Sequence, residues 1–335
     1  MTRLPHHSRL LLAALILGLS VPVAGQEPNK PAPSSAGGVE GTEALTIPFD
    51  PPIGIPLTYA MRLERKRPGG ESVYDYEQRL TFERIEGGFL LRLETLAFMI
   101  GGQRLDLADS RVMERFPAAL RPYLLPMSVE LDEAGEMVRM RDWEAMRANL
   151  RELPDAAAKL SDVSDEAAGR AALAQFLGPI INASAEDAPA LMIRGWPSVL
   201  GFGGIEVDLG ETYEAEGEVE GGLLPASIPA VVQFTVTRTP EGKLRLFQST
   251  SYDPEAMRAA TNAVIDAARA AAVGGGKSGA GETFGAMQAS DTVDIELDPS
   301  NGMPITAEVL RIVSVDITSE SGAGGEIMTI TRIAP

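Results

Sequence analysis

Residues 57–95 alternate apolar and polar side chains with a period of two, and this alternation limits the fold more than any other feature of the chain. Three such runs follow one another, separated by glycine-containing segments at 67–70 and 86–88. Their apolar positions are Leu57, Tyr59, Met61, Leu63, Tyr74, Tyr76, Leu80, Phe82, Phe89, Leu91 and Leu93. Strict alternation is typical of strands with one buried and one solvated face. We therefore expect an antiparallel meander whose outer face is charged.

The rest of the chain changes between strand and helix periodicity. A hairpin is predicted over 127–140, followed by a helix with Asp142 as N-cap and a second helix from about 164–166. A third helix is predicted over 253–273, with Asp253 as N-cap and Pro254 as its first residue. Further strands are predicted at 204–220, 230–239, 243–251, 291–298, 304–317 and 326–333. Because the helices must bury their apolar stripes, the predicted fold class is α+β: a curved antiparallel sheet (half-barrel) with helices packed on one face.

Two related segments suggest an internal repeat. Residues 142–148 read DWEAMRA and residues 253–259 read DPEAMRA, and each follows a hairpin with a glycine in its turn. Repeated units bury related apolar faces against one another, so this match predicts pseudo-repeats over 57–182 and 204–335. Chance similarity in an alanine-rich chain is the alternative. We expect a single sheet-and-helix domain over 45–335, with no prediction for the path of 97–126.

The first 44 residues are predicted to lie outside that domain. Within residues 1–25, a short basic stretch with Arg3 and Arg9 precedes an apolar run over 10–23, and small residues precede Gln26. This order is that of a cleaved secretory signal, and the run is too short to span a bilayer. Residues 26–44 are rich in Pro, Ser, Gly and Glu, which predicts a disordered linker. The sequence therefore predicts a periplasmic protein that does not span the membrane after removal of the signal.

The chain has no cysteine, and its two histidines, His6 and His7, lie in the predicted signal. A mature protein without thiol or imidazole excludes Ser-His-Asp and Cys-His catalysis, Cys/His zinc sites, disulfides and haem on histidine. A net charge of −18 disfavours nucleic acids and anionic membrane surfaces as partners. No cofactor and no metal is predicted.

Motifs for nucleotide binding and serine catalysis are incomplete. Gly276-Lys277-Ser278 resembles the end of a phosphate-binding loop, but the required first glycine falls at Ala271 and a helix precedes it where a strand is needed. The same segment lacks the final glycine of a nucleophile elbow. We therefore predict neither a bound nucleotide nor covalent serine chemistry.

Carboxylates are the remaining route to catalysis. Glu214, Glu216, Glu218 and Glu220 lie on one face if the segment is extended, with about 7 Å between neighbours. Calcium would relieve their repulsion, whereas a solvated strand face is the simpler interpretation. Two carboxylates also suffice for glycoside hydrolysis. A hydrolase acting on envelope glycans is therefore one alternative function.

The apolar face offers candidate ligand-binding residues. Methionine adapts to varied apolar ligands, and tyrosine combines an apolar ring with a polar tip. The candidates are Tyr59, Met61, Tyr74, Tyr76, Phe82, Phe89, Trp143, Met146 and Phe176. The alternative is that the same residues form an ordinary core.

Three features together resemble the periplasmic lipoprotein-carrier superfamily, which comprises the Lol carrier and related half-barrels. They are the strands at 57–95, the segment Gly210-Glu211-Thr212-Tyr213 at the start of a strand, and the hairpin Asp298-Pro299-Ser300-Asn301-Gly302-Met303-Pro304. The resemblance implies a curved antiparallel sheet whose concave side is covered by helices and accepts an acyl chain. Our leading hypothesis is a non-enzymatic periplasmic protein that binds an apolar ligand or an envelope protein. A protein interaction module is the third alternative.

Overall fold

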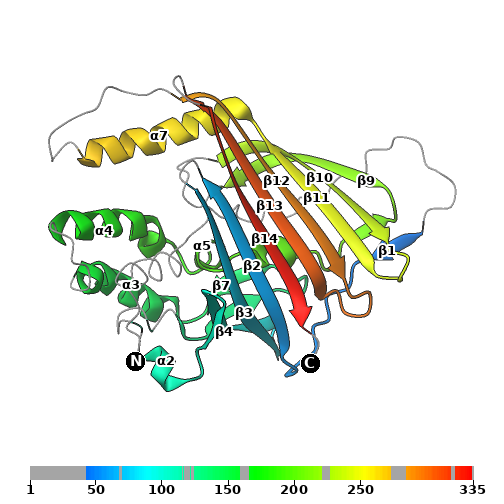
Figure 1. Ribbon diagram of the computed structural model, residues 1–335. Helices are drawn as coiled ribbons and strands as arrows, with labels where there is room; N and C mark the ends of the chain where they lie inside the picture. Colours follow the sequence, from blue (N-terminus) through cyan, green and yellow to red (C-terminus); the bar gives the residue numbers. More distant parts are fainter. Residues whose placement is uncertain are drawn as a thin grey trace.

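One large antiparallel sheet dominates the described part of the chain (Figure 1). The computed structural model describes residues 43–67, 70–114, 116, 121, 124–158, 166–220, 227–272, 284–317 and 321–333. The strands are β1 (Ala44–Thr46), β2 (Leu57–Arg67), β3 (Gly70–Ile85), β4 (Gly88–Ile100), β5 (Gln103–Asp106), β6 (Met127–Leu131), β7 (Met137–Met140), β8 (Glu206–Asp208), β9 (Thr212–Glu220), β10 (Ser227–Arg238), β11 (Leu244–Tyr252), β12 (Phe284–Leu297), β13 (Pro304–Ile317) and β14 (Ser321–Ile333). The helices are α2 (Ser110–Met113), α3 (Trp143–Ala158), α4 (Glu166–Asn182), α5 (Ala188–Met192), α6 (Trp196–Val199) and α7 (Pro254–Ala272).

The order of the strands is that of a meander interrupted in mid-chain. Across the large sheet the order is β7-β6-β4-β3-β2-β14-β13-β12-β11-β10-β9, and β5 pairs with β4. The first and last long strands, β2 and β14, therefore lie side by side. Among the described strands β7 and β9 end the sheet, and the chain between them supplies α3 to α6 and β8. The described sheet is open, because β7 and β9 at its two ends do not pair with each other.

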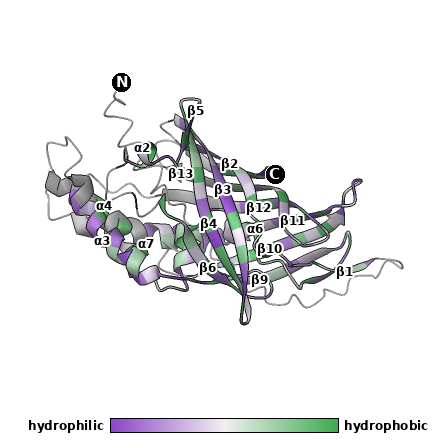
Figure 2. Cartoon of the chain, turned by 90° about the horizontal axis from the view of Figure 1, so that it is seen from below, coloured by the Kyte–Doolittle hydropathy of each residue, from purple (hydrophilic) through white to green (hydrophobic). Residues whose placement is uncertain are grey.

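The two faces of the sheet carry different side chains. Cross-strand pairing puts Met61 opposite Tyr76 and Phe82 opposite Leu91, on what we call the inner face. Directly opposite residues share a face, so these buried side chains form a common core. The outer face carries exposed or half-exposed ion pairs of Arg62 with Asp75, Arg79 with Glu94, Arg245 with Asp294 and Lys243 with Glu296. Figure 2 shows the resulting alternation along β3 and β4.

Helix α7 begins at the predicted cap and covers part of the inner face. Asp253 Oδ1 accepts a hydrogen bond from the Ala256 amide at 2.7 Å, and Pro254 is the first helical residue. Met257 packs against Tyr252 of β11 in a separate apolar group that we call the α7 cluster. The members of this cluster are Val219, Ile228, Ala230, Tyr252, Met257 and Ala260.

The N-cap gives a first testable prediction. We expect Asp253→Ala to lower the free energy of unfolding by about 1 kcal/mol, because the Ala256 amide loses its acceptor. Urea denaturation measures this loss, and Asp253→Asn is the matched control because it keeps an oxygen at the cap. An equal loss in both variants would contradict the capping role.

Helix α3 follows the predicted β6–β7 hairpin. Trp143 is 2% exposed and donates from Nε1 to the Ala183 carbonyl at 3.0 Å. The preceding residue, Asp142, has φ 59°, a left-handed backbone that few non-glycine residues adopt. Its carbonyl oxygen accepts from the Ala145 and Met146 amides. The predicted duplication that relates 57–182 to 204–335 stays a prediction.

Residues 44–54 cross one end of the sheet. β1 pairs with β8, the Asp50 amide donates to the Asn301 carbonyl at 2.9 Å, and the Gly54 amide donates to the Phe82 carbonyl at 2.8 Å. Gly302 has φ +71°, and a Cβ there would lie 1.7 Å from the Pro48 carbonyl oxygen. This crossing therefore ties β3 to the β12–β13 turn, and it requires glycine at the predicted Asn301-Gly302 turn.

The prediction of an antiparallel α+β fold is confirmed, and one strand prediction is wrong. Residues 204–220 form two strands, β8 and β9, because Gly210 turns the chain with φ +85° and donates to the Val236 carbonyl at 2.7 Å. β8 pairs with β1 and lies outside the large sheet. In the described part of the chain no helix is long and apolar enough to cross a membrane. The predicted signal at 1–25 and most of the predicted linker at 26–44 lie outside the described residues.

Candidate functional site

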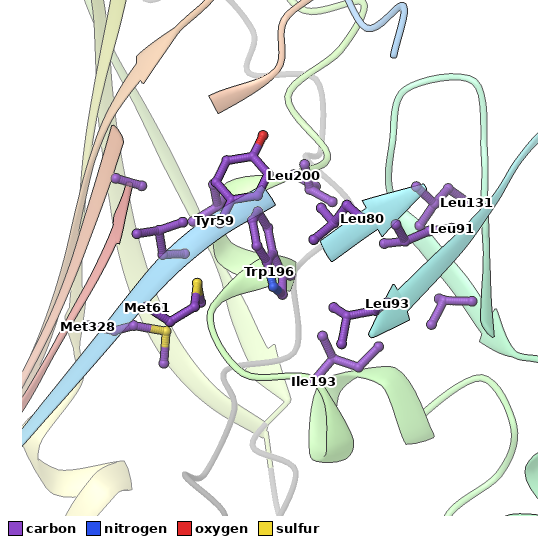
Figure 3. Close-up of a cluster of buried hydrophobic side chains, with 14 of the residues drawn as sticks. Tyr59, Met61, Leu80, Leu91, Leu93, Leu131, Ile193, Trp196, Leu200 and Met328 are labelled. Carbon is purple, nitrogen blue, oxygen red and sulfur yellow. The ribbon is translucent and has the colours of Figure 1, made fainter. Parts of the chain in front are cut away.

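The inner face surrounds a short helical segment that contains Trp196. Helix α5 contacts β7, and α6 contacts β12 and β13, so the segment joins distant strands. Trp196 is 0% exposed and packs edge-on against Tyr59, with ring centroids 4.9 Å apart. Its Nε1 donates to Oε1 of Gln78 at 2.8 Å. Figure 3 shows the indole between Tyr59 and Met61 of β2 and Leu80 of β3. The segment therefore forms part of the core of the sheet.

The nine predicted ligand-binding residues fall into groups of different burial. Residues that are at most 2% exposed and lie in the main apolar cluster are Tyr59, Met61, Phe82, Phe89 and Trp143. Residues that are partly buried against the same cluster are Tyr74, Tyr76 and Met146. The Phe176 side chain lies outside the described residues. The first group makes core contacts, as the alternative interpretation expected, and ligand binding by the nine residues stays a prediction.

Four charged residues lie side by side across the inner face, in what we call the inner charge row. Asp291 of β12 lies opposite Arg311 of β13, which lies opposite Glu326 of β14, which lies opposite Arg65 of β2. Arg311 donates to both carboxylate oxygens of Asp291, at 2.9 and 3.0 Å. Arg65 donates to Glu326 at 2.6 Å. Charges of opposite sign therefore alternate along the row.

Arg194 adds a fifth charge to this row from the linker between α5 and α6. Its Nη1 lies 3.8 Å from Oε2 of Glu326, and its Nη2 is buried without a hydrogen-bond partner among the described residues. At the other end, the Tyr252 hydroxyl donates to Oδ2 of Asp291 at 2.8 Å. Among the described side chains, Arg65, Arg194 and Arg311 thus lie beside the carboxylates of Glu326 and Asp291.

The two arginines at the centre of this arrangement are compensated differently. Burial lowers the pKa of Arg311, but two hydrogen bonds to Asp291 outweigh it, and the net pKa is raised. Burial also lowers the pKa of Arg194, to about 10, because the attraction of Glu326 is insufficient and Arg65 repels the charge. The charged form of Arg194 is therefore less well compensated than that of Arg311.

Arg194 is positioned by its neighbours in the chain. Ile193 is 3% exposed, and Trp196 is fully buried. Gly195 has φ +72°, and a Cβ there would lie 2.3 Å from Sδ of Met328. Glycine is thus required where the chain turns between two buried anchors. The backbone of the linker directs Arg194 toward the inner charge row with little freedom.

Apolar side chains lie on both sides of the inner charge row. Two residues away from the row, the inner face carries Val293, Val309, Met328, Leu63 and Tyr74 in adjacent strands. Beyond the opposite side lies the α7 cluster, to which Tyr252 belongs. Few polar groups are available to screen charges in such surroundings, so an uncompensated cation attracts an anion more strongly than it would at the surface.

The predicted glutamate row lies elsewhere. Glu214, Glu216 and Glu218 are exposed on β9, on the face opposite to Tyr213 and Val219. Gln233 Nε2 donates to Glu214 at 2.6 Å. This confirms the solvated strand face for these three residues. Within the described ranges no group of three or more Asp, Glu, His or Cys residues is arranged to bind a metal ion. The side chain of Glu220 and residues 276–278 are not described.

The inner charge row was not predicted from the sequence, although three of its residues stand at positions where the strand pattern calls for an apolar side chain. Arg65 continues the alternation of Tyr59, Met61 and Leu63, so it lies on the apolar phase of its strand. Asp291 likewise precedes Val293, Ile295 and Leu297 in phase, and Glu326 precedes Met328 and Ile330. A charged residue on the buried phase of a strand is more informative than one on the exposed phase. Arg194 lies outside the strands, so no alternation pattern marks it in the sequence.

The fold and this arrangement define a class: an open antiparallel sheet that covers its apolar inner face with helices and encloses a row of paired charges there. Comparison with known proteins adds no family: no family model matches the chain, and no curated protein matches it. A solved structure of a protein of unknown function from the DUF3598 family of Nostoc punctiforme aligns with 82% of this chain and 95% of its own, at 10% identity. The TM-score of 0.13 is too low for any inference from that alignment. The resemblance to lipoprotein carriers has no support from these comparisons.

Proposed function

We propose that this chain is an exported, non-enzymatic protein that binds an apolar or amphipathic ligand at the inner face of a half-barrel sheet. The observation that carries the proposal is the incomplete burial of apolar residues on that face. Tyr74, Tyr76, Phe234 and Val309 pack against the main cluster but stay partly accessible. Ligand sites are mostly apolar with a few polar groups at defined positions. The inner face beside the inner charge row has this composition.

The test compares two neighbouring residues that lie on opposite faces of β3. Tyr74 is on the inner face, and Val73 is on the outer face with 42% exposure. We expect Tyr74→Asp to weaken the binding of the neutral dye N-phenyl-1-naphthylamine at least about tenfold, because the dye then meets a carboxylate where an aromatic ring was. Val73→Asp is the matched control and should bind the dye as the unmodified protein does.

Native mass spectrometry of the gently purified protein completes the test. A co-purifying acyl compound, displaced by the dye, would identify the ligand class. Failure of the unmodified protein to bind the dye or long-chain amphiphiles would reject the proposal. Equal loss of binding in Tyr74→Asp and Val73→Asp would move the site away from the inner face.

The geometry gives less support to the two alternatives, a glycan hydrolase and a protein interaction module. Glycan hydrolysis by two carboxylates needs an acid with a raised pKa. In the described part of the chain the carboxyl groups with clear shifts are Asp106, Glu130 and Asp298, and hydrogen bonds lower the pKa of each. For an interaction module, the end strand β9 carries exposed glutamates, and charges of this kind discourage pairing with another strand.

A further inference from the structure

We propose that Arg194, together with Arg65 and Arg311 of the inner charge row, binds the anionic head group of an amphipathic ligand, a carboxylate or a phosphate attached to a long apolar chain. This inference rests on the proposed function and names the class of ligand. It begins from the buried Nη2 of Arg194, which has no hydrogen-bond partner in the described residues. Buried polar groups are nearly always partnered, so an unpaired donor of a cation points to an anion that is bound in use.

The inner charge row explains why the internal carboxylates leave this donor unpaired. Asp291 already accepts two hydrogen bonds from Arg311 and one from Tyr252. Glu326 accepts from Arg65 at 2.6 Å, which leaves Arg194 at the longer distance of 3.8 Å. An additional anion beside Arg194 would supply the acceptor that its Nη2 lacks among the described residues. A carboxylate or phosphate is suited to this, because its oxygens accept from guanidinium in pairs.

The position of Arg194 connects this charge to an apolar surface. Tyr74 and Tyr76 lie close enough to Arg194 to influence the pKa of its guanidinium group. Both tyrosines are partly buried on the inner face. An aliphatic chain that extends from an anion at Arg194 would therefore lie along tyrosine rings and the neighbouring apolar rows. A small inorganic anion would gain only the charge interaction, so the arrangement favours an amphiphile over free phosphate.

The experiment compares hexadecanoate with hexadecan-1-ol, which share a chain and differ in charge, by displacement of N-phenyl-1-naphthylamine. We expect the unmodified protein to bind hexadecanoate at least about tenfold more tightly than the alcohol, because charge-assisted hydrogen bonds are strong. Arg194→Met should bind both at the level of the alcohol, and Arg194→Lys should keep part of the preference. Arg79→Gln, which removes an arginine from the outer face, is the matched control and should behave as the unmodified protein does.

Each outcome separates the two proposals. If neither compound binds, the proposed function fails. If both bind the unmodified protein equally, or if Arg194→Met and Arg194→Lys both keep the full preference, the head-group site is wrong and the binding function stands. Inorganic phosphate is added as a competitor. If millimolar phosphate displaces hexadecanoate from the unmodified protein but not from Arg194→Met, the site takes a free anion, and the assignment to an amphiphile is overturned.

Discussion

Replacement of Trp196 by alanine is expected to lower the free energy of unfolding by about 4 kcal/mol, one of the largest effects of any single change in this chain. The side chain is fully buried, and its ring packs on the inner face of β2 and β3, against Tyr59 and beside Leu80. Alanine leaves a cavity there and also removes the partner of Gln78 Oε1. The unpaired buried acceptor accounts for about 1–3 kcal/mol of this loss, and the cavity accounts for the rest.

Urea denaturation of Trp196→Ala and Trp196→Phe separates the two contributions. Trp196→Phe keeps an aromatic ring but has no N–H for Gln78, so we expect it to lose about 1–3 kcal/mol. Phe247→Ala is the control for aromatic truncation, because Phe247 is 46% exposed on the outer face and should change stability by less than about 0.5 kcal/mol. A similar small loss for Trp196→Ala would mean that the α5–α6 segment is not part of the core.

Much of the sheet was predictable from local pattern. The alternation at 57–95, the glycine turns and the cap at Asp253 each depend on neighbouring residues, and the observed elements follow them. Pairing between distant strands was not predictable in this way. β2 and β14 lie side by side, yet Arg65 and Glu326 are separated by 261 positions in the chain. Local periodicity gives each strand a buried face but not its neighbour.

The candidate site could not be predicted in full, because it depends on which distant segments lie side by side, and periodicity does not give this information. The strand aromatics Tyr59, Tyr74, Tyr76, Phe82 and Phe89 do lie on the inner face. Tyr59 and Phe82 fill the core there. Arg194 and Trp196 belong to a segment of two helices with five and four residues, too short for a helical stripe to be recognised. Gly195 between them is required by its positive φ and by the closeness of Met328 of β14, and both are visible only in the folded chain. The position of Arg194 in the site is thus set by contacts between distant parts of the chain, which the sequence pattern does not show.

Glu326→Gln and Arg194→Met are expected to change stability in opposite ways. Glu326 lies between Arg65 and Arg194, so its neutralisation leaves two buried guanidinium groups facing each other without an acid between them. Loss of one partner of a buried pair costs about 3–5 kcal/mol. Arg194→Met instead removes the charge that the row compensates poorly, and an apolar side chain suits its surroundings. We expect Arg194→Met to stay within about 1 kcal/mol of the unmodified protein or to exceed it.

The double variant tests whether both effects arise from the same repulsion between Arg194 and Arg65. If they do, Glu326→Gln combined with Arg194→Met should be more stable than Glu326→Gln alone by at least about 1 kcal/mol, because residues in one charge network do not behave additively. Glu94→Gln is the matched control, since its partner Arg79 is 40% exposed and such pairs contribute less than about 1 kcal/mol. A loss of more than about 2 kcal/mol in Arg194→Met would show that the ligand-free fold depends on this cation. Arg194 would then be a structural partner of Glu326 rather than a group kept ready for an incoming anion.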